Sequence, residues 1–422
     1  MIPYSENSMS TDNLSEADSL PYLYVALPVM NEPELLAQTL SCIDSQTYRH
    51  FKVFICVNQP EHWWEDPSKA EFCKNNLRSI DLLKSIVEFE VIILDRATKG
   101  NGWKGKQHGV GHARRIIMEE INKVASPDDV IISLDADTTF SDRYFLSVAH
   151  SFSKNQHIVA LCNPYFHKEV NDEKTNRAML HYEIYMRHYF LQMDRIGSPY
   201  SFTALGSAMS FPVWAYRAIG GMTPKMSGED FYFLQKLRKF GTVLLWNDEL
   251  VYPAARFSDR VFFGTGPAMI KGASGDWTSY PVYPNFFFNE ILETYLLLPL
   301  LYFQTFNTNI TRFLSAIFDL EDPYQCLREN NKDMDHFIRA FHEKFDGLRI
   351  LQYLKTENSR IFSNDEENLK SFLDLYYPEM KKKLKINWNT FSFSKSPVAE
   401  LTKIRGFFFE KEMEQRFISI LP

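Results

Sequence analysis

Two carboxylates separated by one alanine, Asp135 and Asp137, follow a short apolar run in the sequence. The run, residues 130–134, is rich in β-branched side chains, which is typical of a buried strand in a parallel sheet. Side chains two residues apart share one face of a strand, so we expect both carboxylates to face the same way. Such oxygen donors bind Mg²⁺ or Mn²⁺, and the pattern predicts a divalent metal here. The alternative is an ordinary turn, because Asp also starts turns.

The composition is that of a globular protein. The chain has 422 residues, of which 45% are hydrophobic and 23% are charged, and its formal net charge is −7. An acidic chain argues against nucleic-acid binding, which needs a basic surface. The five cysteines form no Cys-x-x-Cys pair and lie mostly in apolar runs. We therefore expect reduced, buried thiols and a cytoplasmic protein.

The sequence predicts neither a signal peptide nor a transmembrane segment. Residues 1–19 are polar and acidic, which is typical of a flexible tail. The longest apolar run, residues 295–303, contains Pro299 and is well short of the ~20 residues that cross a bilayer. We expect a protein that is soluble or peripheral to the membrane.

The first 160 residues alternate strand-like runs with helical patterns. This alternation predicts an α/β fold with a mostly parallel, Rossmann-like sheet and helices on both faces. The predicted strands are residues 22–29, 51–58, 87–94 and 130–134, and the helices between them are 33–46, 71–86 and 107–124. Because parallel strands end at one edge of a sheet, the polar residues that follow them should converge there. These residues are Asn31, Glu32, Asn58, Asp95, Asp135 and Asp137.

Five short motifs occur in an order that resembles family 2 glycosyltransferases with the GT-A fold. They are Pro28–Glu32, Gly109 with Ala113 and Arg114, Asp135–Asp137, Gly206–Ser207 followed by Gly220–Gly221, and Gly228–Asp230. The resemblance covers residues 22–250. It implies an enzyme that moves a sugar from a nucleotide-diphosphate donor to an acceptor hydroxyl.

On the donor side, the resemblance implies that Asp137 contacts the metal and Asp135 the metal or the ribose. Mn²⁺ or Mg²⁺ would offset the charge of the diphosphate. Pro28, Asn31 and Glu32 would line the nucleotide site, and Asn58 stands where many relatives carry an aspartate. An asparagine amide can still pair with a base edge. The alternative for Glu32 is an acid favoured by the first turn of its own helix.

A glycine- and lysine-rich loop, residues 100–106, precedes the third predicted helix. Lys106, together with Lys104 and Arg114, forms a basic cluster suited to phosphate oxygens. Glycines in the loop let the backbone approach a ligand closely. The alternative is a solvated turn, and the loop is not a Walker A motif.

On the acceptor side, the resemblance assigns the general base to Asp230. Such a base takes the proton of the attacking hydroxyl, which implies one direct displacement with inversion. Glu229 would orient the acceptor or the helix, and Gly206 and Ser207 belong to the acceptor-side loop. The alternative for Asp230 is a capping box with Ser227.

Two further stretches could serve the substrates. Arg256 and Arg260 precede a glycine-rich loop and could close over the diphosphate as a lid, although a surface loop is the ordinary interpretation. Aromatic residues gather between positions 277 and 288. They could form a sugar-stacking platform or a partner surface, but packing of a helical region is the favoured alternative.

We therefore expect a flexible tail (1–19), a GT-A core with a nucleotide-sugar half (20–140) and an acceptor half (141–250), a loop-rich lid (251–285) and a helical C-terminal region (286–422). The expected partners are a nucleotide-sugar and a glycan or small-molecule acceptor in glycan or polysaccharide biosynthesis, without nucleic acid. One alternative is a GT-A domain that binds sugar nucleotide or glycan without turnover. A nucleotidyltransferase is disfavoured, because residues 31–33 do not supply its glycine- and arginine-rich loop.

Overall fold

The computed structural model describes residues 20–420 except 106, 226–227 and 258–264. These residues form two compact units. The sheet unit comprises residues 20–165, 206–224 and 241–252, and the helical unit comprises residues 166–205, 225–240 and 253–420.

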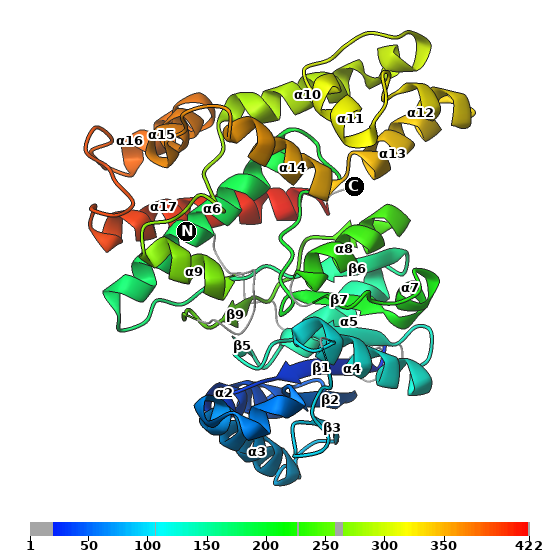
Figure 1. Cartoon of the computed structure of the whole chain (residues 1–422), viewed down its shortest axis with the longest axis vertical. Helices are drawn as coiled ribbons and strands as arrows, with labels where there is room; N and C mark the ends of the chain where they lie inside the picture. The colour runs from blue at the N-terminus through cyan, green and yellow to red at the C-terminus, as the bar shows by residue number, and fades with distance from the viewer. Residues whose placement is uncertain (1–19, 106, 226–227, 258–264, 421–422) are drawn as a thin grey trace, which may run out of the picture. The chain divides into compact units, whose positions relative to one another are not determined.

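The sheet unit is built on a seven-stranded sheet with the strand order β3-β2-β1-β4-β7-β6-β8 (Figure 1). Strands β1 to β4 run parallel to one another, and β6 runs parallel to β8, whereas β7 is antiparallel to both β4 and β6. The predicted α/β class with a mostly parallel sheet is confirmed. The strands are β1 (Leu23–Val29), β2 (Phe51–Asn58), β3 (Val91–Arg96), β4 (Val130–Ser133), β6 (Ile158–Cys162), β7 (Met209–Pro212) and β8 (Thr242–Leu244).

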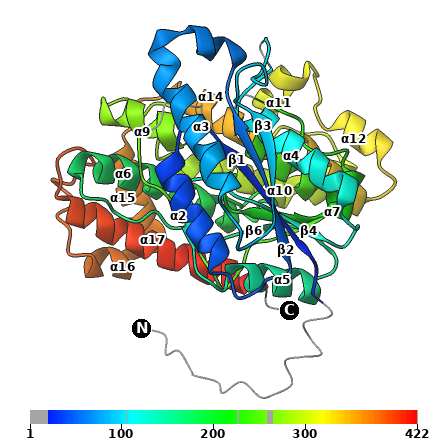
Figure 2. The ribbon, with the colours of Figure 1, turned by 90° about the horizontal axis from the view of Figure 1, so that it is seen from below.

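Helices cover both faces of this sheet (Figure 2). The chain steps from β1 to β2 to β3 in one direction and then returns to β4 on the other side of β1. Right-handed crossovers therefore put α2 and α3 on one face and α4 on the other. The helices of this unit are α2 (Pro33–Asp44), α3 (Ala70–Lys84), α4 (Val110–Val124), α5 (Tyr144–Lys154) and α7 (Val213–Ala218), with short 3₁₀ turns at Glu61–Glu65 and Pro67–Lys69. Strand β5 (Thr138–Phe140) pairs with β9 (Val251–Pro253) in a separate two-stranded sheet.

The apolar pattern explains why α4 packs on the sheet. Ala113, Ile117 and Ile121 recur every four residues and are fully buried, which is one stripe of a helix. The third strand begins later than predicted, at Val91, because Val87 is 86% exposed and lies before it.

The strand order reverses between β1 and β4. Residues Leu23–Ala26 of β1 pair with Val130–Ser133 of β4, while the connection from β1 leads away to β2. The carboxyl ends of two such strands border the crevice in which open α/β sheets bind ligands. The segments that follow β1 and β4 are therefore the first place to look for a site.

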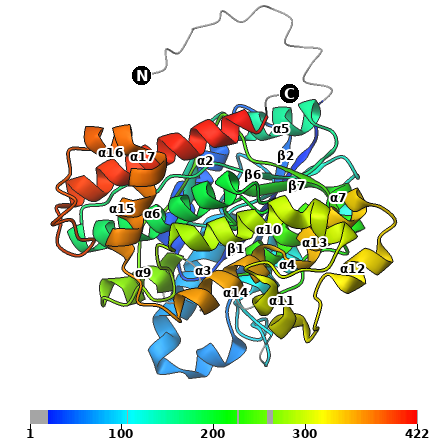
Figure 3. The same ribbon diagram turned by 90° about the horizontal axis from the view of Figure 1, so that it is seen from above.

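The helical unit has a long helix, α6, along which α17 and α9 pack (Figure 3). The predicted acceptor half (141–250) is divided, because α6 and α8 belong to this unit. Both faces of α6 carry buried residues, so it cannot serve as a one-sided cover of the sheet. The helices are α6 (Glu173–Arg195), α8 (Glu229–Phe240), α9 (Thr265–Ala273), α10 (Asn285–Phe303), α11 (Thr311–Phe318), α12 (Gln325–Asn330), α13 (Met334–Lys344), α14 (Gly347–Asn358), α15 (Asp365–Tyr376), α16 (Pro378–Lys383) and α17 (Val398–Ile418).

Buried charges join α6 to α17. Glu183 and Arg187 of α6 form ion pairs with each other, and Arg187 also pairs with Glu412 of α17. Arg405 of α17 donates to Glu183 over 3.1 Å, and Arg416 donates to Glu412 over 2.8 Å. All five side chains are at most 3% exposed. Buried charges are tolerated only when paired in this way.

Helix α10 is longer than the apolar run in the sequence indicated. Within the described residues it is one helix that could cross a membrane by length and composition alone, and about a third of it is buried. The prediction of no transmembrane segment stays a prediction.

Candidate active site

Asp135 and Asp137 lie beyond the end of β4, which stops at Ser133. The backbone N–H of Thr138 donates to the carbonyl of Asp135 over 3.2 Å, so the two acids belong to a turn. The expectation that strand geometry makes them share a face was wrong, because the strand ends too early. The alternative, a turn at the strand end, describes the backbone correctly. Between the two acids Ala136 is fully buried, whereas both acids are half-buried.

Asp135 is held by an arginine beneath it. Arg114, on the second turn of α4, is 2% exposed, and its guanidinium donates to Oδ1 of Asp135 over 2.5 Å. The Asp135 side chain is 37% exposed. In this pair the carboxylate of Asp135 is accessible to solvent, whereas the guanidinium of Arg114 is buried. A direct contact between Arg114 and phosphate remains a prediction.

Gly206 completes this corner of the site. Its carbonyl accepts a hydrogen bond from Ser133 Oγ over 2.7 Å. A Cβ atom at position 206 would lie 2.4 Å from the Arg114 guanidinium, a distance that no side chain permits. The glycine predicted on the acceptor side therefore packs against the residue that holds Asp135, and Ser207 beside it is buried.

The segment after β1 lies at the neighbouring strand end. Asn31 has a left-handed φ of 58°, and its backbone N–H donates to Asn76 Oδ1 over 2.7 Å. Glu32 is only 7% exposed and stands at the N-cap of α2, but its side chain caps no backbone N–H. The alternative for Glu32, an acid favoured by the first turn of its own helix, stays open, because a favourable charge at a helix start needs no capping hydrogen bond. Pro28 lies buried within β1, opposite Cys56.

Asn58 is 2% exposed, and both ends of its amide have partners. Its Nδ2 donates to the Val29 carbonyl over 3.0 Å, and its Oδ1 accepts from the Trp103 indole over 3.2 Å. Asn58 thus ties the end of β1 to the glycine-rich loop. Its predicted contact with a base remains a prediction.

Sequence reasoning missed the residue that shapes this loop, Glu61. Its carboxylate accepts from the backbone N–H groups of Gly100 and Gly102, both over 2.7 Å. A Cβ atom on Gly102 would lie 2.6 Å from that carboxylate, so the glycine is needed for Glu61 rather than for a ligand. A single glutamate in a loop carries no sequence signal of this role. Lys104 is exposed, and Lys106 lies outside the described residues.

The carboxylate of Asp95, at the end of β3, also accepts hydrogen bonds from neighbouring residues of the chain. Burial raises its pKa, but hydrogen bonds from Thr98, Ala97 and Asn101 outweigh burial and hold the pKa below its usual value. The oxygens that accept these bonds fix the turn after β3. Asp95 therefore stabilises the turn that follows β3, at the same edge of the sheet as Asp135.

The acceptor-side acids belong to the helical unit. Glu229 and Asp230 begin α8, with Glu229 2% exposed and Asp230 half-buried. Helix α8 is anchored through Gln235, which donates to Asp346 over 2.8 Å. Ser227, the other half of the predicted capping box, and Arg260 lie outside the described residues. Arg256 is half-buried.

A model of glycosyl transferase family group 2 matches residues 130–273. This part of the chain is similar to family group 2 glycosyltransferases. The matched segment runs from β4 to α9, about one third of the chain, and it contains Asp135, Asp137, Gly206, Glu229 and Asp230. No curated protein matches the chain in sequence.

Solved structures of glycosyltransferases are similar to the chain at low identity. TarS 1–349 of S. aureus in complex with UDP-GlcNAc aligns with 80% of this chain and 91% of its own, at 10% identity and a TM-score of 0.41. The mannosyltransferase PcManGT from Pyrobaculum calidifontis in complex with GDP-Man and Mn²⁺ aligns with 91% and 86%, at 13% identity and a TM-score of 0.37. These scores are too low to define a donor or an acceptor, which must be argued from the residues.

Asp135 and Asp137 fit a divalent cation that is bound jointly with a substrate. Within the described residues, no group of three or more His, Cys, Asp or Glu side chains could hold a metal by itself. Arg114 donates to Oδ1 of Asp135, and the chain would contribute carboxylate oxygens of Asp135 and Asp137 to the cation. Carboxylates are suitable ligands for Mg²⁺ or Mn²⁺, which commonly takes its other ligands from phosphates and water.

Proposed function

We propose that this protein is a glycosyltransferase that transfers a sugar from a nucleotide-diphosphate donor to an acceptor hydroxyl, with Mn²⁺ or Mg²⁺ and with inversion. The observation that carries the proposal is the Arg114–Asp135 pair beside Gly206 at the end of β4. A carboxylate held by a buried cation, at the point where the strand order reverses, suits a fixed donor site.

Asp135 and Asp137 would hold the cation, and Glu32 would contact the ribose or the base from the end of β1. The cation supplies positive charge to the diphosphate as it departs. Arg114 keeps Asp135 in one orientation, so the donor meets a site that needs little rearrangement. The remaining proposed contacts are Pro28, Asn31, Asn58 and Lys106 for the donor, Arg256 and Arg260 for a lid, and Gly206, Ser207 and Glu229 for the acceptor side.

Asp230 is proposed as the general base. The oxygen of the acceptor hydroxyl forms a bond to the anomeric carbon while the bond from that carbon to the diphosphate oxygen breaks. The hydroxyl proton passes to the Asp230 carboxylate, and the nucleoside diphosphate leaves. A single displacement of this kind inverts the anomeric centre. The start of a helix holds a carboxylate firmly for such a transfer.

We further propose that the protein works in the cytoplasm or at a membrane surface, in the synthesis of a glycan or polysaccharide. The cysteines support an intracellular setting, because none of the five, all of which the structure describes, forms a disulfide and three are buried. Apolar side chains exposed on α10, among them Leu296 at 72% and Phe303 at 76%, are compatible with contact at a membrane surface.

A thermal-shift screen against nucleotide-diphosphate sugars, with and without Mn²⁺, tests the donor site. A true donor stabilises the protein by mass action, and saturating ligand raises the melting temperature measurably. Asp137→Ala should remove the Mn²⁺-dependent part of that shift. A nucleotide-sugar that shifts wild type and Asp137→Ala equally would contradict the metal role. No shift with any donor would contradict the proposed function.

A further inference from the structure

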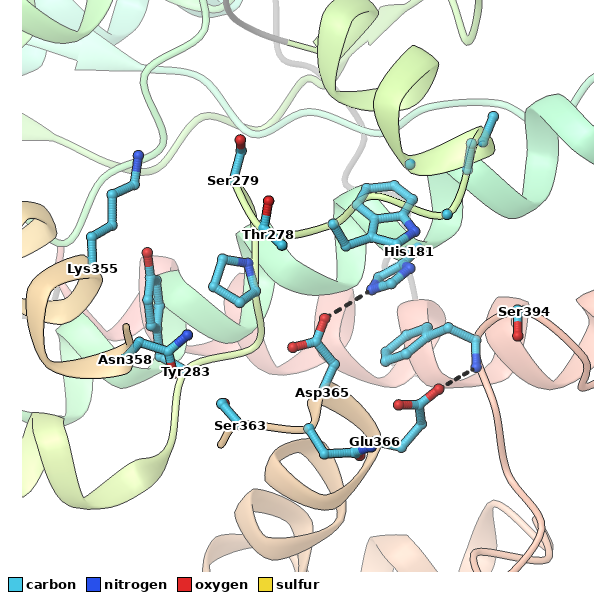
Figure 4. A pocket seen from close by; sticks show the side chains of 18 of the residues that line it. His181, Thr278, Ser279, Tyr283, Lys355, Asn358, Ser363, Asp365, Glu366 and Ser394 are labelled. Atoms are coloured by element: carbon cyan, nitrogen blue, oxygen red, sulfur yellow. Dashed lines mark hydrogen bonds and ion pairs between the residues drawn. The ribbon is translucent and has the colours of Figure 1, made fainter. Parts of the chain in front are cut away.

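The helical unit contains a cavity of about 1080 Å³, which α6 lines together with residues between 272 and 283 and the end of α14 (Figure 4). Side chains of both charges surround it, among them Lys355, Asp365 and Glu366. A lining of mixed charge favours neither an anion nor a cation. The sheet unit, in contrast, contains a chain of buried amides whose hydrogen bonds lead to one segment, the connection from β1 to α2.

Helix α3 buries an asparagine where its pattern calls for an apolar residue. The buried stripe of this helix recurs at intervals of three and four residues and includes Cys73, Ile80 and Leu83. Asn76 belongs to the same stripe and is fully buried. A buried amide is costly unless it is hydrogen-bonded, so an asparagine at this position indicates a specific polar role.

Both ends of the Asn76 amide have partners in other segments of the sheet unit. Its Oδ1 accepts from the backbone N–H of Asn31 over 2.7 Å, and its Nδ2 donates to Oε1 of Gln59 over 2.7 Å. Gln59 is also fully buried, and its Nε2 donates to Sγ of Cys73 over 3.2 Å. Asn76 therefore links the segment after β1 to the segment after β2.

The backbone of Gln59 is held on both sides. Its N–H donates to the carbonyl of Arg96, and its carbonyl accepts from the N–H of Trp103, both over 2.9 Å. Arg96 ends β3, and Trp103 follows the glycines of the glycine-rich loop. The chain of amides thus spans the carboxyl ends of β1, β2 and β3, and Asn76 fastens Asn31 to a frame that is fixed elsewhere.

The residue that Asn76 holds has an uncommon backbone conformation. Asn31 has a left-handed φ of 58°, which L-residues adopt rarely, although asparagine does so more readily than most. A second amide of α3 supports it, because Nδ2 of Asn75 donates to Oδ1 of Asn31 over 2.9 Å. Two adjacent residues of α3 therefore fix both the main chain and the side chain of Asn31.

The turn at Asn31 determines the position of Glu32. Glu32 follows it directly and is the N-cap of α2, which begins at Pro33. This segment lies at the end of β1, where the strand order reverses and where open α/β sheets bind ligands. Because the φ of Asn31 sets the direction in which the chain leaves β1, a change in that angle would displace the Glu32 carboxylate.

We propose that Asn76 is a positioning residue for the nucleotide of the donor: it holds Asn31 in the left-handed conformation and thereby places Glu32 against the ribose or the base. Asn76 is fully buried and acts without touching the donor. The inference rests on the proposed function for the identity of the ligand, but the hold on Asn31 can be measured without any donor.

Amide hydrogen exchange in the ligand-free full chain tests the hold on Asn31. In Asn76→Ala the Asn31 amide loses its acceptor and should exchange faster than in wild type by about tenfold or more. Ser79→Ala is the matched control, because Ser79 is buried on the same helix but donates only to the Asn75 carbonyl of that helix. It should leave the exchange of the Asn31 amide unchanged. Equal exchange in wild type and Asn76→Ala would overturn the proposal.

Steady-state kinetics test the consequence for the donor, with the nucleotide-sugar that the thermal-shift screen identifies. Asn76→Ala should raise the KM for the donor by about tenfold and lower kcat by less than about threefold. The reason is that the substitution loosens a segment that binds the donor and removes no proposed metal ligand or general base. Ser79→Ala should keep the KM of wild type.

Asn76→Asp separates positioning from stability. The carboxylate keeps an acceptor for the Asn31 N–H, and the Gln59 amide can turn so that its Nε2 donates to the new oxygen. A buried carboxylate should lower the melting temperature by about 2–4 °C or more, at least as much as alanine does. The KM should nevertheless stay within about threefold of wild type. A purely structural role would make KM follow the melting temperature in all three variants.

The two proposals fail in distinguishable ways. If wild type binds no nucleotide-sugar, the proposed function is contradicted, and the donor role of Asn76 is contradicted with it. If wild type binds a donor and Asn76→Ala keeps the KM of wild type, the donor site stands and the positioning role alone is wrong.

Discussion

The guanidinium of Arg114 and the carboxylate of Asp135 lie 2.5 Å apart, one almost fully buried and the other facing solvent. The pair joins α4 to the turn after β4 within the sheet unit. A rotatable aspartate is thereby fixed before any donor arrives. Preorganisation of this kind lowers the free-energy cost of binding.

Arg114→Met should therefore weaken donor binding more than it weakens the fold. The substitution keeps a long apolar stem but removes the hydrogen bond to Asp135. We expect the free energy of unfolding to fall by about 1–2 kcal/mol, because Asp135 is partly exposed and solvent screens the pair. The KM for the donor should rise by about tenfold or more. Urea unfolding and initial rates measure the two effects. An unchanged KM would show that Asp135 needs no such support.

Gly206→Ala should reproduce the functional loss without touching a charged residue. The new methyl would lie 2.4 Å from the Arg114 guanidinium and must displace it. A displacement on this scale costs about 10–100-fold in donor kcat/KM. Gly406→Ala is the matched control, because nothing lies within 4 Å of its added methyl and it lies inside α17. The control should gain about 1 kcal/mol of stability and keep full activity. Equal activity in both variants would refute the steric argument.

The sequence predicted the strands of the sheet well, because each combines a β-branched run with a polar end. Predicted strand 51–58 coincides with β2, and predicted strand 22–29 differs from β1 by one residue at its start. Strand β3 was displaced by four residues at its start, because Val87 resembles a strand residue in the sequence although it is exposed. Hydrophobicity alone does not indicate which apolar residues pair with a neighbouring strand and become buried.

Roles that depend on distant contacts were not predictable. Arg114 resembled a phosphate ligand beside a helix start, yet it is buried under Asp135, 21 positions away. Glu61 shapes the glycine-rich loop from about 40 positions away. Helix α6 follows the core strand β6 in sequence but packs on α17, whose sequence lies more than 200 residues later. Such partners are fixed by tertiary packing, which one sequence does not display.

Glu183 gives a pH dependence of stability. Burial raises its pKa, but the charge of Arg187, the contact with His167 and the charge of Arg405 outweigh burial and lower the pKa to about 2. A carboxylate whose pKa is lower in the folded state contributes stability above its unfolded pKa of 4.5 and loses it as pH falls toward 2. The contribution is about 3 kcal/mol.

Glu183→Gln should remove this part of the pH dependence and destabilise the protein at neutral pH by about 3–5 kcal/mol, because Arg187 and Arg405 lose a buried partner. Urea unfolding at about pH 6 and about pH 3 measures both effects. Glu410→Gln, an exposed change on α17, should behave as wild type. A Glu183→Gln variant whose stability falls with acid as steeply as that of wild type would contradict the assignment.

Asp230→Asn should separate donor binding from transfer. The amide keeps the shape of the carboxylate but cannot accept a proton at neutral pH, so the acceptor hydroxyl loses its base. General-base catalysis contributes about 10²–10⁴-fold, and kcat should fall by that amount while the donor-induced thermal shift is kept. Replacing an acid in the first turn of α8 should cost only about 0.3–1 kcal/mol of stability.

Asp335→Asn is the matched control for Asp230→Asn, because Asp335 also lies in the first turn of a helix of the helical unit and is exposed. It should lose a similar small amount of stability and no transfer activity. Product analysis completes the test, since a displacement assisted by one base gives a glycoside of inverted anomeric configuration. Full transfer by Asp230→Asn, or a product with the anomeric configuration of the donor, would require a different residue or a different mechanism.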